Sequence, residues 1–127
     1  MNTMGQMQKV IDELILLIGK ECFKQALDIY EKRIAHILDN NIPSIQRKTL
    51  LLLGSRIYYF NQQYDQANTY LLQLERDYKD IEFNFEYVKT KFNILSAKGK
   101  TSEALTFIKK AISHEWDQDE HHALHFN

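Results

Sequence analysis

Three short stretches of this sequence match one another, and their spacing limits the fold more than any other feature does. They are residues 23–27, 64–68 and 101–105. Aligning them superimposes Ala26, Ala67 and Ala104, which stand 41 and 37 residues apart. A repeat of this length is typical of helical hairpins that stack side by side. A methyl group allows two helix backbones to approach closely, so we expect each alanine to lie where two helices cross.

Residues that interrupt helices are few, and they fall between segments of helical period. Gly19 and four short stretches, at residues 39–43, 61–63, 77–80 and 98–101, divide the 127 residues into six segments. Within each segment apolar residues recur at three- and four-residue spacing, whereas the long strict alternation of a strand is absent. The sequence therefore predicts an all-α protein, with three antiparallel helical hairpins stacked as a short α-solenoid. We expect one domain over residues 1–115, with repeats at about 7–39, 43–78 and 81–114, and a C-terminal tail or cap over 116–127.

Composition narrows the class of partner and the compartment. Lys and Arg total 16 against 17 Asp and Glu, and without a basic block we expect no nucleic acid partner. Cys22 is the single cysteine, so no intrachain disulfide forms and a reducing compartment fits. The apolar run from Leu14 to Ile18 is far shorter than the roughly 20 residues that span a bilayer, so no membrane association is expected. The first residues lack the basic region of a secretory signal, which predicts a cytoplasmic protein.

The middle segments resemble the tetratricopeptide repeat family. The positions that carry the resemblance are Leu51, Gly54, Ser55, Tyr58, Tyr64, Ala67, Leu71 and Leu74. Gly54 departs from the family pattern, because a large residue usually stands there. The resemblance covers roughly residues 7 to 114, and it implies a stack of helix pairs. Since the family's period is about 34 residues, the 41-residue step implies about two extra helical turns near residues 33–45. Another six-helix bundle or solenoid remains the alternative.

The resemblance also implies a binding surface, because the first helices of stacked hairpins line a concave wall. The family's wall positions that we select as a partner-binding site are Leu52, Arg56, Tyr59, Lys89 and Asn93. Lys89 and Asn93 resemble two members of a clamp by which some family members hold a peptide carboxylate, although the other members are absent. A protein or peptide partner is therefore expected at this wall.

The first predicted helix is apolar on nearly every side. Ile11, Ile15 and Ile18 belong to a stretch that leaves almost no polar face. A terminal helix needs to bury only one stripe, so another surface should cover the rest. There are three candidates for this covering surface. The first is a second copy of the chain, which would make a homodimer; the others are a different partner and the protein's own tail.

Candidates for catalysis are weak. The dispersed glycines form no phosphate-binding loop, Gly54-Ser55 lacks the flanking glycine of a nucleophile elbow, and no histidine lies near Cys22 in sequence. We therefore expect neither an enzyme nor a cofactor. If the C-terminal segment were helical, one face would carry histidines and a carboxylate at the spacing of a metal site: His114, Asp117, His121 and His125. Alternatively, Trp116, Leu124 and Phe126 fold back as a cap. The leading interpretation is a non-catalytic interaction module, an adaptor or chaperone-like binder; the alternative is a metal-binding protein or metal-dependent enzyme.

Overall fold

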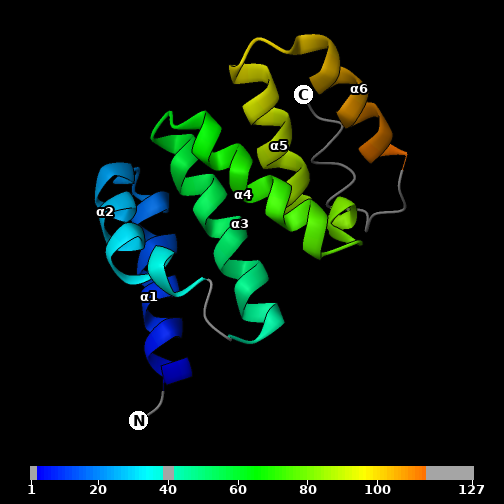
Figure 1. Ribbon diagram of the computed structural model, residues 1–127. Helices are drawn as coiled ribbons and strands as arrows, with labels where there is room; N and C mark the ends of the chain where they lie inside the picture. Colours follow the sequence, from blue (N-terminus) through cyan, green and yellow to red (C-terminus); the bar gives the residue numbers. More distant parts are fainter. Residues whose placement is uncertain (1–2, 39–41, 114–127) are drawn as a thin grey trace.

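The computed structural model of the chain describes residues 3–38 and 42–113 (Figure 1). Helices make up 83% of these residues, and none of them lies in a strand. The α-helices of this part are α1 (Thr3–Gly19), α2 (Phe23–Arg33), α3 (Ser44–Phe60), α4 (Tyr64–Asp77), α5 (Phe85–Ala97) and α6 (Thr101–Ile112). Two single turns of 3-10 helix, η1 (Ala35–Ile37) and η2 (Ile81–Phe83), precede α3 and α5. The prediction of an all-helical protein with six packed helices is confirmed.

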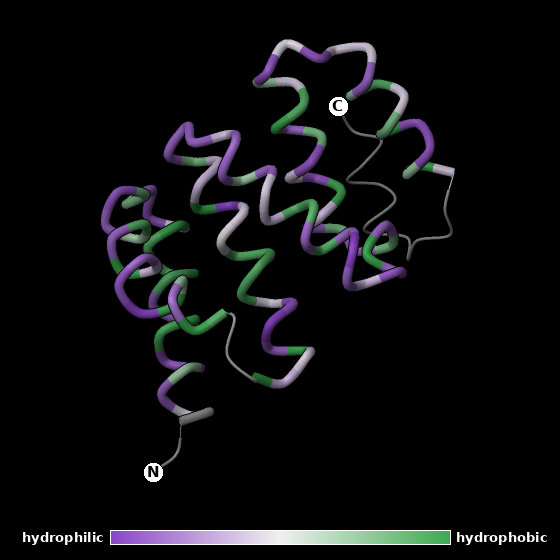
Figure 2. Tube along the Cα trace, viewed as in Figure 1, coloured by the Kyte–Doolittle hydropathy of each residue, from purple (hydrophilic) through white to green (hydrophobic). Residues whose placement is uncertain are grey.

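Consecutive helices pack in pairs, α1 on α2, α3 on α4 and α5 on α6 (Figure 1). The pairs also contact one another, because α3 packs on α2 and α5 as well as on α4. Figure 2 shows apolar and polar residues changing in short steps along every helix, as expected where one side of a helix faces its neighbours. The helix α3 therefore lies at the centre of the packing.

The three turns that join the helices of a pair have the same geometry. One residue in each has a positive φ: Glu21 at 60°, Gln62 at 63° and Gly99 at 78°. In each, the next amide donates a hydrogen bond of 2.9 Å to the carbonyl five residues before it, as from Gln63 to Tyr58. This is a helix C-cap with a left-handed residue, and it reverses the chain within three residues. The repeat seen in the sequence thus extends to backbone conformation.

The alanines of the repeat are buried as expected. Ala26 and Ala67 have no exposed surface, and Ala104 is 1% exposed. Each lies in the first turn of the second helix of its pair, directly after the tight turn. A small side chain there permits the close approach of the two helices.

A cluster of three tyrosines joins the first two helix pairs. Tyr30 from α2, Tyr58 from α3 and Tyr70 from α4 have ring centroids 5.5 to 6.1 Å apart. The hydroxyl of Tyr30 donates a hydrogen bond to the carbonyl of Leu50 at 2.8 Å, and Tyr58 donates to the Glu31 carboxylate at 3.0 Å. Aromatic rings packed at steep angles stabilise a fold beyond the burial of their apolar surface, so this cluster stabilises the packing of α2 on α3.

The extra residues of the 41-residue step do not simply lengthen a helix. The helix α2 ends at Arg33, and the chain continues as the single turn η1, while residues 39–41 lie outside the described part. Ile34 and Leu38 are buried, at 0% and 6% exposure. Ile34 and Leu38 stand four and eight residues after the buried Tyr30, which is the spacing of one helix face, so the side of α2 that faces the core is continued through η1.

Candidate functional site

The central helix α3 is buried on most of its circumference, and one stripe of it stays accessible. The stripe follows a spacing of three and four residues through Ile45, Thr49, Leu52, Arg56 and Tyr59. Ile45 is 82% exposed, whereas the side chain of Arg56 is 27% exposed. This spacing places the five residues on one side of the helix. The helix α5 packs beside α3. We call Leu52, Arg56 and Tyr59 of α3, together with Glu86, Lys89 and Asn93 of α5, the α3–α5 face.

Two cations of this face meet at one carboxylate. The Nε of Arg56 lies 3.5 Å from Oε2 of Glu86, and the Nζ of Lys89 lies 4.0 Å from Oε1 of the same residue. Oε2 is buried and accepts no hydrogen bond within the described part of the chain, so the charge of Arg56 is its nearest compensation. The Lys89 ammonium also lies 5.5 Å from the ring centroid of Phe85. An acidic group of a partner would therefore compete with Glu86 for both cations.

The other predicted residues of this face lie at different points along it. Tyr59 packs on Phe60 and Tyr64 near the end of α3, with ring centroids 5.4 and 5.8 Å away. Burial, and then the nearby Tyr64, raise the pKa of Tyr59 above its usual value. Leu52 and Asn93 are half-buried. The structure thus brings Arg56 and Lys89 together, while Tyr59 belongs to an aromatic group at the turn.

The three isoleucines predicted for self-association do not share one surface. Ile11 and Ile18 are 5% and 8% exposed and belong to the core with Leu14 between them. Ile15 is 51% exposed, and beside it Leu16 is 56% exposed. The spacing from Ile11 to Leu14 and Ile18 forms the stripe that packs against α2, so only Ile15 of the three is available to a second copy of the chain.

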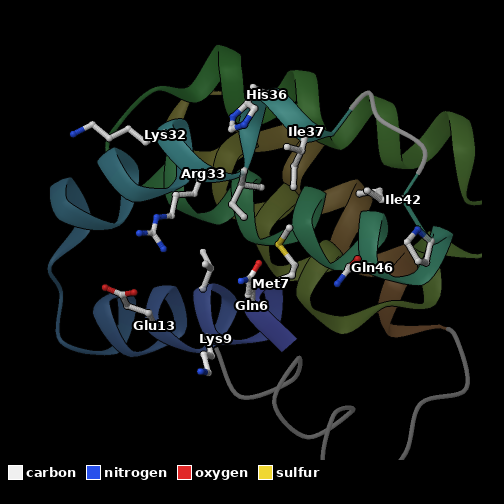
Figure 3. Close-up of a pocket in the computed structure, with 13 residues that line it drawn as sticks. Gln6, Met7, Lys9, Glu13, Lys32, Arg33, His36, Ile37, Ile42 and Gln46 are labelled. Carbon is white, nitrogen blue, oxygen red and sulfur yellow. The ribbon is translucent and has the colours of Figure 1, made fainter. Parts of the chain in front are cut away.

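A cleft of about 1000 Å³ opens between α1, the end of α2 with η1, and the start of α3 (Figure 3). Its floor is apolar and consists of Met7, Val10, Ile34, Ile37 and Ile42. Its rim is mainly basic and includes Lys9, Glu13, Lys32, Arg33 and His36. Sequence reasoning missed this cleft, because its residues come from three segments whose packing the sequence does not reveal. The available signal was Arg33, which stands where the other two repeats carry an apolar residue.

The described residues offer little evidence for a metal site or for a reactive thiol. In residues 3–38 and 42–113, no three His, Cys, Asp or Glu side chains are grouped as metal ligands. His114, Asp117, His121 and His125 lie outside the described residues. The thiol of Cys22 is half-buried and lies 3.7 Å from the carbonyl of Lys20. In the same described part, no helix combines the length and apolar character needed to cross a membrane.

Comparison of the chain with family models, with curated proteins and with solved structures finds no match. What the chain does has to be inferred from its own residues.

Proposed function

We propose that this chain is a non-catalytic protein interaction module that binds a peptide, or a helix of a partner protein, across the α3–α5 face. The observation that carries this proposal is the accessible stripe on α3. A helix packed on three neighbours usually keeps only solvated polar residues on its remaining side. Here that side presents Leu52, Arg56 and Tyr59, next to Lys89 of α5.

The arrangement of a short tetratricopeptide-like stack is part of this proposal. Two observations support it: the same three-residue turn recurs within each helix pair, and a buried alanine follows each turn. In such a stack the first helix of each pair would line a concave wall, and α3 and α5 would be neighbours on it. The packing of α3 on α5 agrees with that order.

The chemistry of the face favours a ligand with an acidic group beside an apolar or aromatic one. Arg56 and Lys89 already hold one carboxylate, that of Glu86, at 3.5 and 4.0 Å. A partner's carboxylate would gain charge-assisted hydrogen bonds from the same two cations. Tyr59 and Leu52 offer the contact area from which interface anchors are made. The module would then act as an adaptor or chaperone-like binder.

The test is to select peptides from a random library on the purified chain and to measure their affinity by calorimetry. Changing both Arg56→Ala and Lys89→Ala should weaken binding about tenfold or more, which corresponds to about 1.4 kcal/mol. The melting temperature is measured alongside, and Glu86→Gln is added to the double variant, because Arg56→Ala leaves the buried Oε2 of Glu86 without its nearest cation.

A matched control removes two cations elsewhere, with Lys24→Ala and Lys109→Ala. Both residues are exposed, on α2 and α6. This control should leave the affinity within about twofold of the unchanged chain. If the control pair weakened binding and the Arg56 and Lys89 pair did not, the binding face would have been assigned wrongly.

A further inference from the structure

The cleft beside α1 concentrates positive charge in a chain that carries a slight negative excess. Three cations, Lys9 on α1 and Lys32 and Arg33 on α2, line it together with the imidazole of His36 on η1 and a single carboxylate, Glu13. The whole chain has a formal net charge of −1. The basic rim is therefore a local feature, and a local field of this kind attracts ligands of opposite charge.

These cations have little compensation from the chain itself. Within the described part of the chain, neither Lys9 nor Arg33 lies within 4.0 Å of a carboxylate oxygen. Lys32 pairs only with Asp28, at 3.2 Å, and both of these side chains are more than half exposed. Figure 3 shows Arg33 reaching from α2 into the space above α1, on the side where Glu13 lies. Exposed pairs such as Lys32 with Asp28 are weak, so an incoming acidic group can displace them.

The floor of the cleft leaves apolar surface uncovered. Val10 and Ile34 are buried, but Met7, Ile37 and Ile42 are only half-buried, and all five line the same space. Met7 lies near the middle of the cleft in Figure 3. An apolar floor below a charged rim fits a ligand that is apolar on one side and acidic on the other.

We propose that this cleft binds an acidic amphipathic helix of a partner protein. Its size agrees, because about two turns of an α-helix, roughly 10 Å across and 11 Å long, fill a volume close to that of the cleft. Its walls are themselves helices, α1 on one side and α2 with η1 on the other, and a third helix between them would pack as helices usually do. The site lies on other helix faces than the α3–α5 face and does not depend on the function proposed for it.

The distribution of charge distinguishes this ligand from an anionic lipid or fatty acid. A fatty acid offers one carboxylate at one end of a chain, and it would need its cations gathered at one point. Here Lys9 lies on one wall, while Lys32 and Arg33 lie on the other, with His36 beyond them on η1. A helix with glutamates along both flanks of its apolar side would meet both walls at once.

The probe is a fluorescently labelled synthetic amphipathic helix with leucines on one side and glutamates along both flanks of that side, added to the full chain. We expect saturable binding that weakens as salt is raised, because the rim is exposed to solvent. The double change Lys9→Glu and Arg33→Glu should weaken binding at least about tenfold. The milder pair Lys9→Gln and Arg33→Gln should act in the same direction by a smaller factor.

The matched control reverses two charges away from the cleft, with Lys24→Glu and Lys109→Glu, and should change the affinity less than about twofold. The melting temperature of every variant is measured alongside. Equal binding of a probe whose glutamates are replaced by lysines would overturn the proposal. So would saturable binding of dodecanoate that is lost in the Lys9 and Arg33 variant while the peptide does not bind.

One further readout tests the chain's own acidic C-terminal segment as the occupant. Trp116 is the only tryptophan of the chain, so its emission reports on that segment alone. If Lys9→Glu with Arg33→Glu leaves this emission unchanged in the absence of peptide, the cleft is open to a partner, as proposed. A shift of the emission on that change would place the chain's own segment in the cleft and overturn the assignment to a partner.

Discussion

The hydroxyl of Tyr30 lies where the side chain of residue 54 would begin, and that residue is glycine. A Cβ at Gly54 would overlap the Tyr30 hydroxyl and the ring of Tyr70. The same hydroxyl donates its hydrogen bond to Leu50, one helical turn before Gly54 on α3. The absence of a side chain at position 54 therefore allows α2 and α4 to place large rings directly against the backbone of α3.

We expect Gly54→Ala to destabilise the protein. Overpacking in a core costs about 1 to 3 kcal/mol, and the better helix propensity of alanine offsets up to about 1 kcal/mol of it. Chemical denaturation followed by circular dichroism measures the change. Adding Tyr30→Phe should recover part of the loss, because it removes the atom nearest to the new Cβ. Gly19→Ala is the control: no atom lies within 4 Å of a Cβ at Gly19, so little change is expected there.

In the turns after α3 and α5, substitutions of the residue with positive φ should change the stability of the protein in opposite directions. Gln62 has a φ of 63°, a left-handed conformation that costs a non-glycine residue roughly 1 to 2 kcal/mol. Gln62→Gly removes this strain but adds about 0.5 to 1 kcal/mol of unfolded-chain entropy, so a net gain of about 0.5 to 1 kcal/mol is expected. Gly99→Ala, at a φ of 78°, should lose about 1 kcal/mol. Two changes of the same sign in thermal denaturation would contradict the shared turn geometry.

High pH should unfold the protein through its buried tyrosines. Burial raises the pKa of Tyr30, Tyr58 and Tyr87 above the usual value of 10.0, and a hydrogen bond of 2.6 Å to Glu75 adds to the effect at Tyr87. A raised folded-state pKa contributes stability that is fully present below about pH 10 and is lost as the pH rises above it. Tyrosinate absorbance should therefore show at least these three tyrosines ionising only as the helical signal disappears.

The change Tyr87→Phe provides the comparison for that titration. It removes one of the late-ionising groups and leaves Lys91 paired with Glu75 at 2.7 Å. Stability should then fall less steeply above about pH 10 than in the unchanged chain. Early ionisation of all seven tyrosines, before any loss of helix, would contradict the burial described for these three residues.

The sequence predicted the features that depend on local patterns. Helical period located the six helices, and the repeat placed Ala26, Ala67 and Ala104 at buried positions near tight turns. Gly54 was noted as a departure from the tetratricopeptide pattern, but its reason lies in Tyr30 and Tyr70, which are distant in sequence. A pattern along one helix does not reveal which ring of another helix fills the space above a glycine.

The candidate sites show the same limit. The resemblance to the tetratricopeptide repeat implied that Arg56 and Lys89 share one wall, yet their ion pairs with Glu86 depend on how α3 and α5 pack. In α1, the apolar run did not indicate which isoleucines face the core, because nearly all of its sides look alike in sequence. The cleft is lined by residues of α1, of α2 with η1, and of the start of α3, so it depends on how segments distant in sequence pack.

Ala67 tests the close approach of the helices that follow a turn. It is fully buried in the first turn of α4. Ala67→Leu should destabilise the protein by about 1 to 3 kcal/mol, because the larger side chain pushes α4 away from α3. Ala97→Leu, at an exposed position near the end of α5, is the control and should be nearly neutral. A neutral result at Ala67 in denaturant unfolding would mean that this alanine does not limit the distance between the two helices.

We propose that Ile15 and Leu16 form the contact if the chain self-associates through α1. They are adjacent, and each is more than half exposed, so pairing with a second copy would remove both from water. We expect light scattering at micromolar to millimolar concentrations to approach twice the mass of one chain. Ile15→Glu with Leu16→Glu should return a folded monomer, because neither side chain belongs to the core.

The matched control, Leu72→Glu with Leu105→Glu, changes apolar residues of similar exposure on α4 and α6 and should leave the association intact. A monomer at every concentration, or loss of the dimer in the control alone, would contradict the assignment of this surface to a second copy of the chain.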